Sequence, residues 1–486
     1  MTPSRDYSLT GPESALAIER GLADADWFRP SIDPARLRAL QVRSDGGAAR
    51  DTVLWLGLLL VAAWCAWWSL GTGDSGDGVG GGLVGLLVSI MCFAIYGALY
   101  GGAADARWHE CGHGTAFRSR WANEVVYNLA CLMLWRGPTL WRWSHHRHHT
   151  DTIIVGRDAE IAFPRPPSVW RTLWGFTHIE GSLRLISRLV RHAVIGLDAD
   201  ACELIPEHDR GRAVWEARVI VGSVLAVVAW SVSVGSVVPL LFIGGPTIYG
   251  GWLMVFFGIT QHAGLQEDVL DHRLNTRTVH MNPVLRFLYL NMNHHVEHHL
   301  FPTVPYHALP DLHREIGDQL APALPSVGAA YREIFSALRG QSTDPSYEIS
   351  LAIPAAVGAG PGAAAVGRID VGERNWVAAD GVEVTLATVE ELAVGEARRI
   401  DHGDRTFVLC RVSDDEVALV DGMCTHSRVH LSGGALLGCE LECPKHNARF
   451  DVRTGEVRRG PARDGLATYA VTIRNGRVVT DFAESP

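Results

Sequence analysis

Three clusters of histidine contain the residues of this sequence that are best suited to bind a metal ion. They read HECGH at 109–113, HHRHH at 145–149 and HHVEHH at 294–299. A spacing of three or four residues places two imidazoles on one face of a helix. Imidazole suits Fe, Cu, Zn and Ni, and it is not the ligand that Mg or Ca prefers. One such cluster could be a solvated surface turn, but three of them between apolar segments predict a shared metal site.

The helical spacing within each cluster distinguishes the histidines that are candidate metal ligands from the other histidines nearby. His262, in the segment GITQHAG, is a further candidate, although an isolated histidine is often only a hydrogen-bonded polar residue. Nine imidazoles are too many for one metal ion and suit two. The nine candidates are His109, His113, His145, His148, His149, His262, His295, His298 and His299. His146 and His294 fall outside the spacing and are predicted to surround the site or to lie on the surface.

A second metal-binding pattern lies near the C-terminus. It combines Cys424-Thr-His426 with Cys443-Pro-Lys-His446. Zinc is one interpretation of two cysteines and two histidines, although zinc sites usually have other spacings, such as paired CxxC-like knuckles. The nine cysteines are an odd number and show no disulfide spacing, which favours a reducing compartment.

Apolar residues are unevenly distributed along the 486-residue chain, which predicts a membrane part and a soluble part. Uncharged runs at Thr52–Leu70 and Val79–Tyr100 are long enough to span a bilayer as helices. The run Val219–Thr260 is long enough for two further spans, so four transmembrane helices in two hairpins are predicted. Arginine flanks the hairpins and is absent from their turns, which favours a cytoplasmic position for both termini and all three clusters. A net charge of −10 makes nucleic acid an unfavourable partner.

The sequence changes character after about Asp380. Short Val, Leu, Ile and Thr runs alternate there with Gly and Asp turns, which predicts a small all-β domain. The low-complexity run Pro354–Gly367 is typical of a flexible linker. We therefore predict a cytoplasmic N-terminal segment (1–50), an α-helical membrane domain (51–340), a flexible linker (341–380) and an all-β domain (381–486). Between the hairpins, residues 183–193 have an amphipathic pattern, typical of a helix at the membrane interface or on a protein surface.

The three clusters, in this order and between two membrane hairpins, resemble those of the integral-membrane fatty acid desaturase and hydroxylase family. The third continues as HHVEHHLFPTVP, and the resemblance covers about residues 50–320. It implies a non-haem di-iron centre that uses O2 to attack an unactivated C–H bond, with the nine histidines as iron ligands. It also suggests Asn291 or Asn293 as the residue that holds a metal-bound water.

The two Cys-His loops, with the following run HNARFDVRTGEV, resemble the Rieske [2Fe–2S] ferredoxin family. The resemblance implies that Cys424 and Cys443 bind one iron and that His426 and His446 bind the other. Respiratory Rieske proteins have an additional disulfide between these loops. Val429 and Lys445 occupy the corresponding positions here, so the ferredoxin type is favoured.

Together the two resemblances imply a membrane oxygenase that receives electrons from its own Rieske domain. A separate NAD(P)H-dependent flavin reductase is expected, because the chain has no glycine-rich dinucleotide fingerprint after a strand. We expect a multi-pass protein of the bacterial cytoplasmic (inner) membrane, with its His clusters and Rieske domain facing the cytoplasm. A fatty acyl or lipid substrate is favoured, by desaturation or hydroxylation.

Other interpretations of the sequence remain open. The run RHHTDTIIVGRDAEI and the fused Rieske domain are similar to the oxygenase–ferredoxin pair of rhizopine catabolism, which implies hydroxylation or oxidative demethylation of a small polar substrate. A soluble mononuclear Rieske oxygenase would have the opposite domain order. A non-catalytic metal transporter or electron-transfer anchor is a third class, although transporters tend to hold their ligands near the middle of the membrane.

Overall fold

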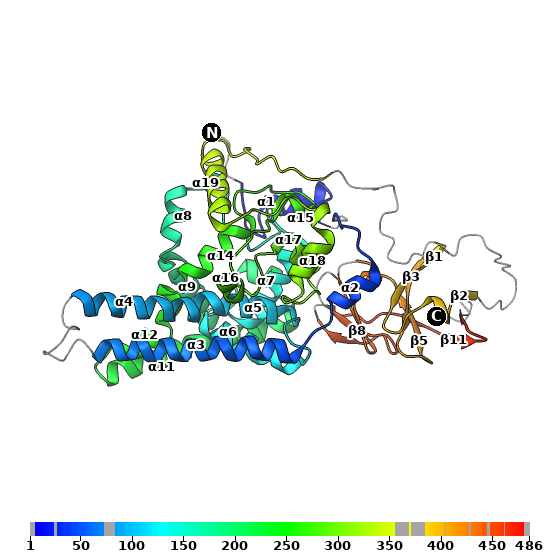
Figure 1. Ribbon diagram of the computed structural model, residues 1–486, viewed down its shortest axis with the longest axis horizontal. Helices are drawn as coiled ribbons and strands as arrows, with labels where there is room; N and C mark the ends of the chain where they lie inside the picture. Colours follow the sequence, from blue (N-terminus) through cyan, green and yellow to red (C-terminus); the bar gives the residue numbers. More distant parts are fainter. Residues whose placement is uncertain are drawn as a thin grey trace. The chain divides into compact units, whose positions relative to one another are not determined.

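The computed structural model describes residues 5–23, 27–71, 83–354, 369–370, 384–403, 405–426, 429–444, 448–460 and 462–480. The chain forms two compact units. The first comprises Met1–Trp27, Arg43–His299 and Leu320–Ile353, and the second comprises Phe28–Val42, Leu300–Gln319 and Pro354–Pro486. Among the described residues, the first unit is helical, whereas the strands belong to the second (Figure 1). The predicted fold class, a helical domain followed by an all-β domain, is confirmed.

Three helices of the described residues are long and apolar enough to cross a membrane. They are α3 (Asp45–Gly71), α11 (Glu207–Ser233) and a continuous helix over Leu83–His113. This last helix consists of α4 (Leu83–Gly97), the π-helical turn η1 (Ala98–Gly102) and α5 (Ala103–His113). The first histidine cluster therefore lies at the end of a helix of spanning length.

The fourth predicted span is broken into short helices. The chain forms α12 (Val238–Phe242), α13 (Gly245–Tyr249) and α14 (Trp252–His262) where a single helix was expected. Gly244 adopts a left-handed conformation with φ of 86°. Prolines occupy the first turns of α12 and α13, where a missing N–H costs no helical hydrogen bond. The described residues thus contain three helices of spanning length where the sequence predicts four.

Close backbone contact joins the Leu83–His113 helix to the segment that carries His262. A Cβ atom added to Gly250 would lie 2.0 Å from the carbonyl oxygen of Gly97, and one added to Gly102 would lie 2.5 Å from Cβ of Leu253. Only glycine permits backbones to approach this closely. These glycines therefore fix the position of α14 against η1 and bring His262 towards the first cluster.

The amphipathic segment predicted at 183–193 lies in α9 (Ile179–Val194). Its Leu189 and Ala193 pack against Ala217 and Ile220 of α11. The other helices that begin in this unit are α1 (Pro12–Glu19), α6 (Arg120–Met133), α7 (Pro138–Thr150), α8 (Val169–Gly175), α10 (Ala199–Leu204), α15 (His272–Asn275), α16 (Pro283–Leu288), α17 (His295–Leu300) and α19 (Val327–Thr343). The second unit contains α2 (Pro34–Leu40), α18 (Leu309–Ile316) and the 3-10 turn η2 (Gly317–Gln319).

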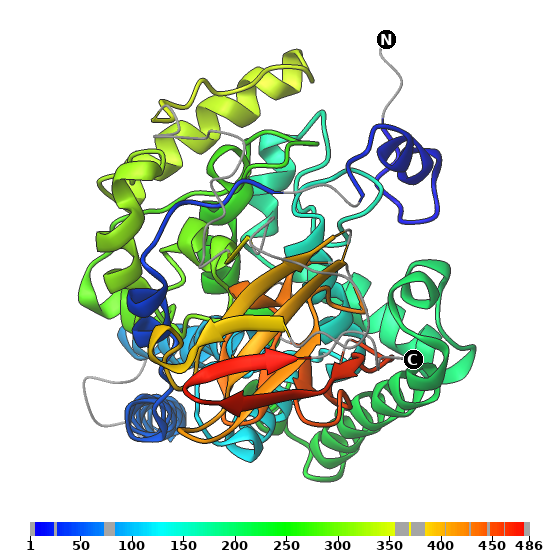
Figure 2. The same ribbon diagram turned by 90° about the vertical axis from the view of Figure 1, so that its right-hand side faces the viewer.

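The described strands of the second unit form three sheets, and Figure 2 turns them towards the viewer. The first has the order β1-β3-β4-β5-β10, the second β11-β12-β2 and the third β6-β7-β8-β9. The strands are β1 (Ile369–Asp370), β2 (Val384–Thr388), β3 (Ala397–His402), β4 (Arg405–Arg411), β5 (Val417–Asp421), β6 (Leu436–Leu437), β7 (Glu440–Glu442), β8 (Arg449–Asp451), β9 (Val457–Arg459), β10 (Thr468–Tyr469), β11 (Val471–Arg474) and β12 (Arg477–Thr480). One core contains Phe407 and Leu409, and a second contains Cys424 and Cys443. Most of the predicted linker, 355–368 and 371–380, lies outside the described residues.

Candidate metal centres

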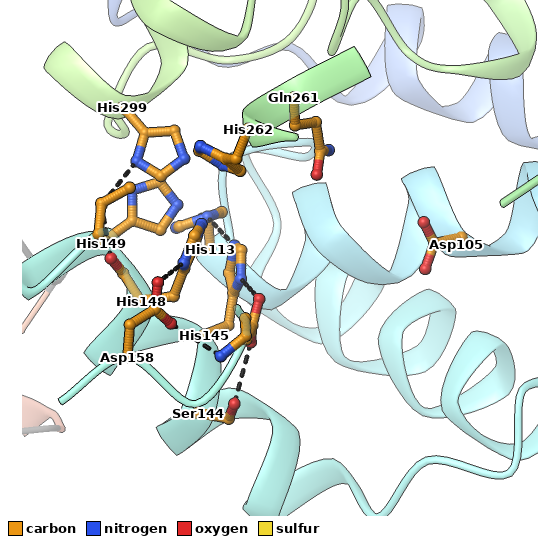
Figure 3. Close-up of polar contacts among 12 residues, drawn as sticks. Asp105, His113, Ser144, His145, His148, His149, Asp158, Gln261, His262 and His299 are labelled. Atoms are coloured by element: carbon orange, nitrogen blue, oxygen red, sulfur yellow. Dashed lines mark hydrogen bonds and ion pairs between the residues drawn. The ribbon is translucent and has the colours of Figure 1, made fainter. Parts of the chain in front are cut away.

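The nine predicted ligands come together in two groups, and within each group the candidate ligand atoms lie within 4.8 Å of one another. Figure 3 shows members of both groups facing each other between the helices. The five-histidine group consists of His109, His113, His145, His149 and His298. The four-histidine group consists of His148, His262, His295 and His299.

Helical periodicity explains how the clusters divide between the groups. Residues four apart share a helix face, so pairs such as His145 and His149 of α7 enter the same group. His148, between them in sequence, points to the other group. The same rule sends His295 and His299 of α17 to the four-histidine group and His298 to the five-histidine group. Two helices therefore each supply ligands to both groups.

The distances between ring nitrogens test whether these groups fit metal ions. Nε2 of His145 lies 3.0 Å from Nε2 of His113, and Nε2 of His299 lies 3.2 Å from Nε2 of His295. Two imidazoles bound at a right angle to one ion through bonds of about 2.1 Å have nitrogens about 3.0 Å apart. Among the residues that the structure describes, neither ring nitrogen of buried His109 has a hydrogen-bond partner. Buried polar atoms rarely stay unpaired, so the groups fit resident metal ions.

The opposite ring nitrogens of several histidines are held by groups outside the two sets. Nδ1 of His148 lies 2.8 Å from Oδ2 of Asp158, and Nδ1 of His145 lies 3.1 Å from Oε2 of Glu160. Nδ1 of His262 lies 2.8 Å from the backbone carbonyl oxygen of Asn275. Such partners orient metal-binding imidazoles and fix their tautomers. Asp158 and Glu160 were not among the site residues predicted from the sequence, although both follow the second cluster within fifteen residues of His145.

The Cys-His loops belong to the second unit, and three of their four predicted ligands are described. Cys424 and Cys443 are buried, whereas His426 is exposed. The backbone N–H of Cys424 donates to the carbonyl of Val429, and that of Cys443 donates to the carbonyl of Ala448. His446 lies outside the described residues. Buried thiols beside an exposed imidazole suit a cluster that exchanges electrons through its histidine side.

Comparisons with known proteins find one protein family for each of the two candidate metal sites. A family profile described as fatty acid desaturase matches residues 83–333, just over half of the chain. The chain belongs to the fatty acid desaturase family. A second profile, described as Rieske [2Fe-2S] domain, matches residues 382–470. The protein is therefore a desaturase-family chain with a fused Rieske domain.

The relatives of the Rieske part include ferredoxin components of dioxygenase systems. The ferredoxin component of the naphthalene 1,2-dioxygenase system from Pseudomonas putida is 41% identical over 70 residues, 14% of this chain and 67% of the relative. The ferredoxin component of naphthalene 1,2-dioxygenase/salicylate 5-hydroxylase systems from Ralstonia sp is 33% identical over 106 residues, 22% of this chain and 94% of the relative. The solved Sphingomonas yanoikuyae B1 ferredoxin is 31% identical, with 21% of this chain and 98% of that chain covered and a TM-score of 0.20.

Family membership gives the two metal sites their identities. The desaturase family has a di-iron site, which the two histidine groups fit, and a Rieske domain holds a [2Fe–2S] cluster. This desaturase-family protein is an O2-dependent iron oxidoreductase. Its three long apolar helices and its family indicate that it associates with a membrane.

Burial sets the protonation of the candidate ligands. Desolvation, together with the neighbouring imidazoles, holds the pKa values of His149 and His298 well below their usual range. Desolvation likewise lowers the pKa of His262 to about 3. His148 differs from these residues. Desolvation lowers its pKa, but the negative charge of Asp158 and the hydrogen bond to it have the larger combined effect, so the pKa of His148 is raised. Most of the ligand set is thus held in the neutral form that binds a metal ion.

The remaining predicted site residues lie outside the two groups. His146 and His294 are buried, and neither is among the nine histidines of the two groups. Oδ1 of Asn291 accepts a hydrogen bond from Nε of Arg286. Nδ2 of buried Asn293 donates to the carbonyl of Val279, and its Oδ1 has no hydrogen-bond partner among the described residues. Of the two asparagines, Asn293 therefore retains more capacity to hold a water.

A cavity of about 270 Å³ adjoins the histidines, and we call it the polar cavity. Its wall includes His109 and His145 of the five-histidine group and His148, His262 and His295 of the four-histidine group. The wall also includes Asp105, Trp108, Arg136, Trp141, Ile153, Glu160, Phe163, Arg165, Met254, Val255, Ile259, Gln261, Glu267 and Gln341. A molecule in the polar cavity would therefore lie against residues of both groups.

Proposed function

We propose that this protein uses O2 and electrons from its own Rieske domain to oxidise a C–H bond of a substrate in the polar cavity. The observation that carries the proposal is that members of both histidine groups line one cavity. The nine predicted histidines hold two iron ions, which supply O2 activation and hydrogen abstraction. Cys424, His426, Cys443 and His446 hold the [2Fe–2S] cluster.

Residues around the histidines orient the metal-binding imidazoles and shield them from water. Asp158 and Glu160 orient His148 and His145 so that their Nε2 atoms face inward. Trp108 and Trp141 of the cavity wall contact each other edge-to-face, and Trp108 also contacts the ring of His145. These rings keep bulk water from the histidines, which protects reactive species from side reactions.

Two reactions fit this site and have the same electron requirement. In hydroxylation, one C–H bond, O2, two electrons and two protons give one C–O–H group and one water. In desaturation, two neighbouring C–H bonds with O2, two electrons and two protons give a C=C bond and two waters. Both begin with removal of a hydrogen atom, so the histidine groups serve either outcome.

The electrons are proposed to reach the Rieske domain from a separate NAD(P)H-dependent flavin reductase. The similarity to ferredoxin components of dioxygenase systems supports this role. The exposed side chain of His426 offers a route in and out of the cluster. The linker proposed for residues 341–380 would keep the donor at high effective concentration near its acceptor.

We further propose that the protein spans the cytoplasmic membrane of a bacterium with its histidine groups and Rieske domain facing the cytoplasm. The distribution of arginine around the apolar runs supports this orientation. A fatty acyl or lipid substrate would reach the site from the bilayer, and a small polar substrate would reach it from water.

Iron counting and O2 chemistry test the proposed function. The purified full-length protein should contain about four Fe, two in the histidine groups and two in the Rieske cluster. With a reductase, NADH and a cell extract, it should consume O2 with matched oxidation of an extract component, detected by mass spectrometry under ¹⁸O2. The variant His298→Ala should lose this oxidation and keep the Rieske visible spectrum. A parent protein with only about two Fe and no substrate oxidation would instead be an electron-transfer anchor.

A further inference from the structure

The wall of the polar cavity is mostly apolar, but it contains more charged side chains than a hydrocarbon chain requires. Small-molecule pockets are mostly apolar, with a small number of polar groups. Here five charged side chains line the wall in addition to the five histidines: Asp105, Arg136, Glu160, Arg165 and Glu267. A methylene chain has no group that can hydrogen-bond to any of them.

The charged groups are paired and held in place. Arg136 Nη1 lies 2.5 Å from Asp105 Oδ1, and its guanidinium lies over the rings of Trp108 and Trp141 at 4.3 and 4.6 Å. The side chains of Asp105 and Arg136 are 20% and 11% exposed, so this pair is partly hydrated. An acyl chain against the pair would remove that water without replacing its hydrogen bonds, which is unfavourable.

A second ion pair stiffens another part of the wall. Arg165 lies 3.5 Å from Glu267 and also donates to the backbone carbonyls of Leu265 and Pro345. Both side chains of this pair are less than a tenth exposed. The polar wall is therefore a built feature of the cavity and not a set of loose surface side chains.

Two side chains of the described wall, Gln261 and Asp105, have oxygen atoms suited to accept hydrogen bonds from a ligand. Nε2 of Gln261 donates to the hydroxyl of Tyr289, which fixes the side-chain amide. Figure 3 shows the Gln261 side chain beside His262, and Asp105 on a different helix. The amide oxygen of Gln261 and the second carboxylate oxygen of Asp105 can both accept hydrogen bonds. Such acceptors favour a ligand that carries hydroxyl or amino donors, and they disfavour an analogue that lacks them.

The volume of the polar cavity gives a scale for the part of a ligand that lies inside it. A cavity of about 150 Å³ holds benzene, which corresponds to about 25 Å³ for each heavy atom. On that scale the 270 Å³ of the polar cavity holds a molecule of about eleven heavy atoms.

We propose that the substrate is a small polar molecule whose hydroxyl or amino groups donate hydrogen bonds to Asp105 and Gln261. The bond that is oxidised lies on the side of the molecule that faces the histidines. This inference rests on the proposed function, because it names the substrate class of the same site. Under this proposal, Asp105 and Gln261 determine which substrates the site accepts.

The test offers the parental holoenzyme two kinds of substrate. The full-length protein, with reductase and NADH, is incubated under ¹⁸O2 with the aqueous fraction of a cell extract, with the lipid fraction, or with palmitic acid. We expect mass spectrometry to show consumption of a component of the aqueous fraction only. Oxidation of palmitic acid or of a component of the lipid fraction would overturn the inference and leave the proposed function intact. If no fraction is oxidised, the proposed function fails as well.

Variants of the two acceptors then test the recognition itself, with the compound consumed from the aqueous fraction as the probe. Gln261→Leu and Asp105→Asn should each raise KM several-fold and keep the parental iron content. The exposed amide Asn128, outside the cavity wall, provides a matched control, and Asn128→Leu should leave KM unchanged. Parental KM values in both cavity variants would overturn the assignment. Because Asp105 also pairs with Arg136, Gln261→Leu decides the matter if Asp105→Asn fails to fold.

Discussion

Oδ2 of Asp158 lies 2.8 Å from Nδ1 of His148, and this contact joins a loop carboxylate to the four-histidine group. Two residues later Glu160 makes the equivalent contact with His145 of the five-histidine group. One short loop thus orients one ligand of each proposed iron site. The same Asp158 oxygen also accepts a hydrogen bond from the backbone N–H of Ile153, which helps to fix the position of the carboxylate.

Asp158→Asn is expected to weaken iron binding at the four-histidine group while the five-histidine group keeps its iron. The amide retains the size of the side chain but removes the charge that supports His148. Loss of such a partner typically lowers metal affinity about 10-fold or more. The measurement is iron retention against increasing chelator, followed with ⁵⁷Fe Mössbauer spectra that separate the two sites.

Glu160→Gln provides the paired comparison, because it should weaken the five-histidine group instead. If both variants lost the same iron signal, the loop would act on the centre as a whole. If neither changed chelator resistance, the two carboxylates would have no role in holding the metal ligands.

His148→Ala is predicted to abolish substrate oxidation, whereas His146→Ala should retain a substantial part of it. His148 lies in the four-histidine group, and its neighbours cannot replace it in geometry. His146 is buried but lies outside both groups, and its ring packs against Trp143. Product formation and iron content are measured for both variants. Equal loss of iron in His146→Ala would show that the ligand register is wrong.

Periodicity explains which parts of the site could be predicted from the sequence. Histidines four apart, such as His109 and His113, share a helix face, so the pairing within each cluster follows from the sequence. The division of the nine candidates into two groups does not, because it depends on how the helices pack. The partners Asp158 and Glu160 could not be assigned in this way, because they lie on an irregular loop without a period. The fourth predicted span is divided into short helices for a local reason, since hydropathy does not register the left-handed conformation of Gly244.

Cys424→Ser is predicted to remove the Rieske cluster and to leave the iron of the histidine groups in place. Cys424 and Cys443 are buried in a core of the second unit, and the nine histidines belong to the first. The purified variant should lose the Rieske visible absorption and retain about two of about four Fe. Its reductase-driven oxidation should be absent. Loss of all iron would mean that the two centres form as one cooperative unit.

The last prediction concerns acid stability and the link between α9 and α10. The Asp198 carboxylate accepts hydrogen bonds from the Nε atom of Arg188 at 2.7 Å and from the backbone N–H of Ala201 at 2.8 Å, and it lies 2.9 Å from Nε2 of His192. Partial burial acts in the opposite direction, but these hydrogen bonds hold the pKa of Asp198 well below its usual range. A depressed carboxyl pKa contributes stability that is complete above the unfolded value, about 4, and is lost as the pH falls further.

Asp198→Asn should therefore lower the thermal unfolding midpoint at pH 7, by the equivalent of about 1 kcal/mol for a partly exposed ion pair. Asparagine caps a helix about as well as aspartate, so this variant isolates the contribution of the charge. The difference in unfolding midpoint between the variant and the parent should shrink as the pH falls below about 4. In that range the Asp198 carboxyl of the unfolded parent becomes protonated, so the charged carboxylate stabilises the folded state less. Unfolding is followed by circular dichroism in detergent at pH 7 and pH 3. A difference of the same size at both pH values would show that Asp198 acts through its shape and not through its charge.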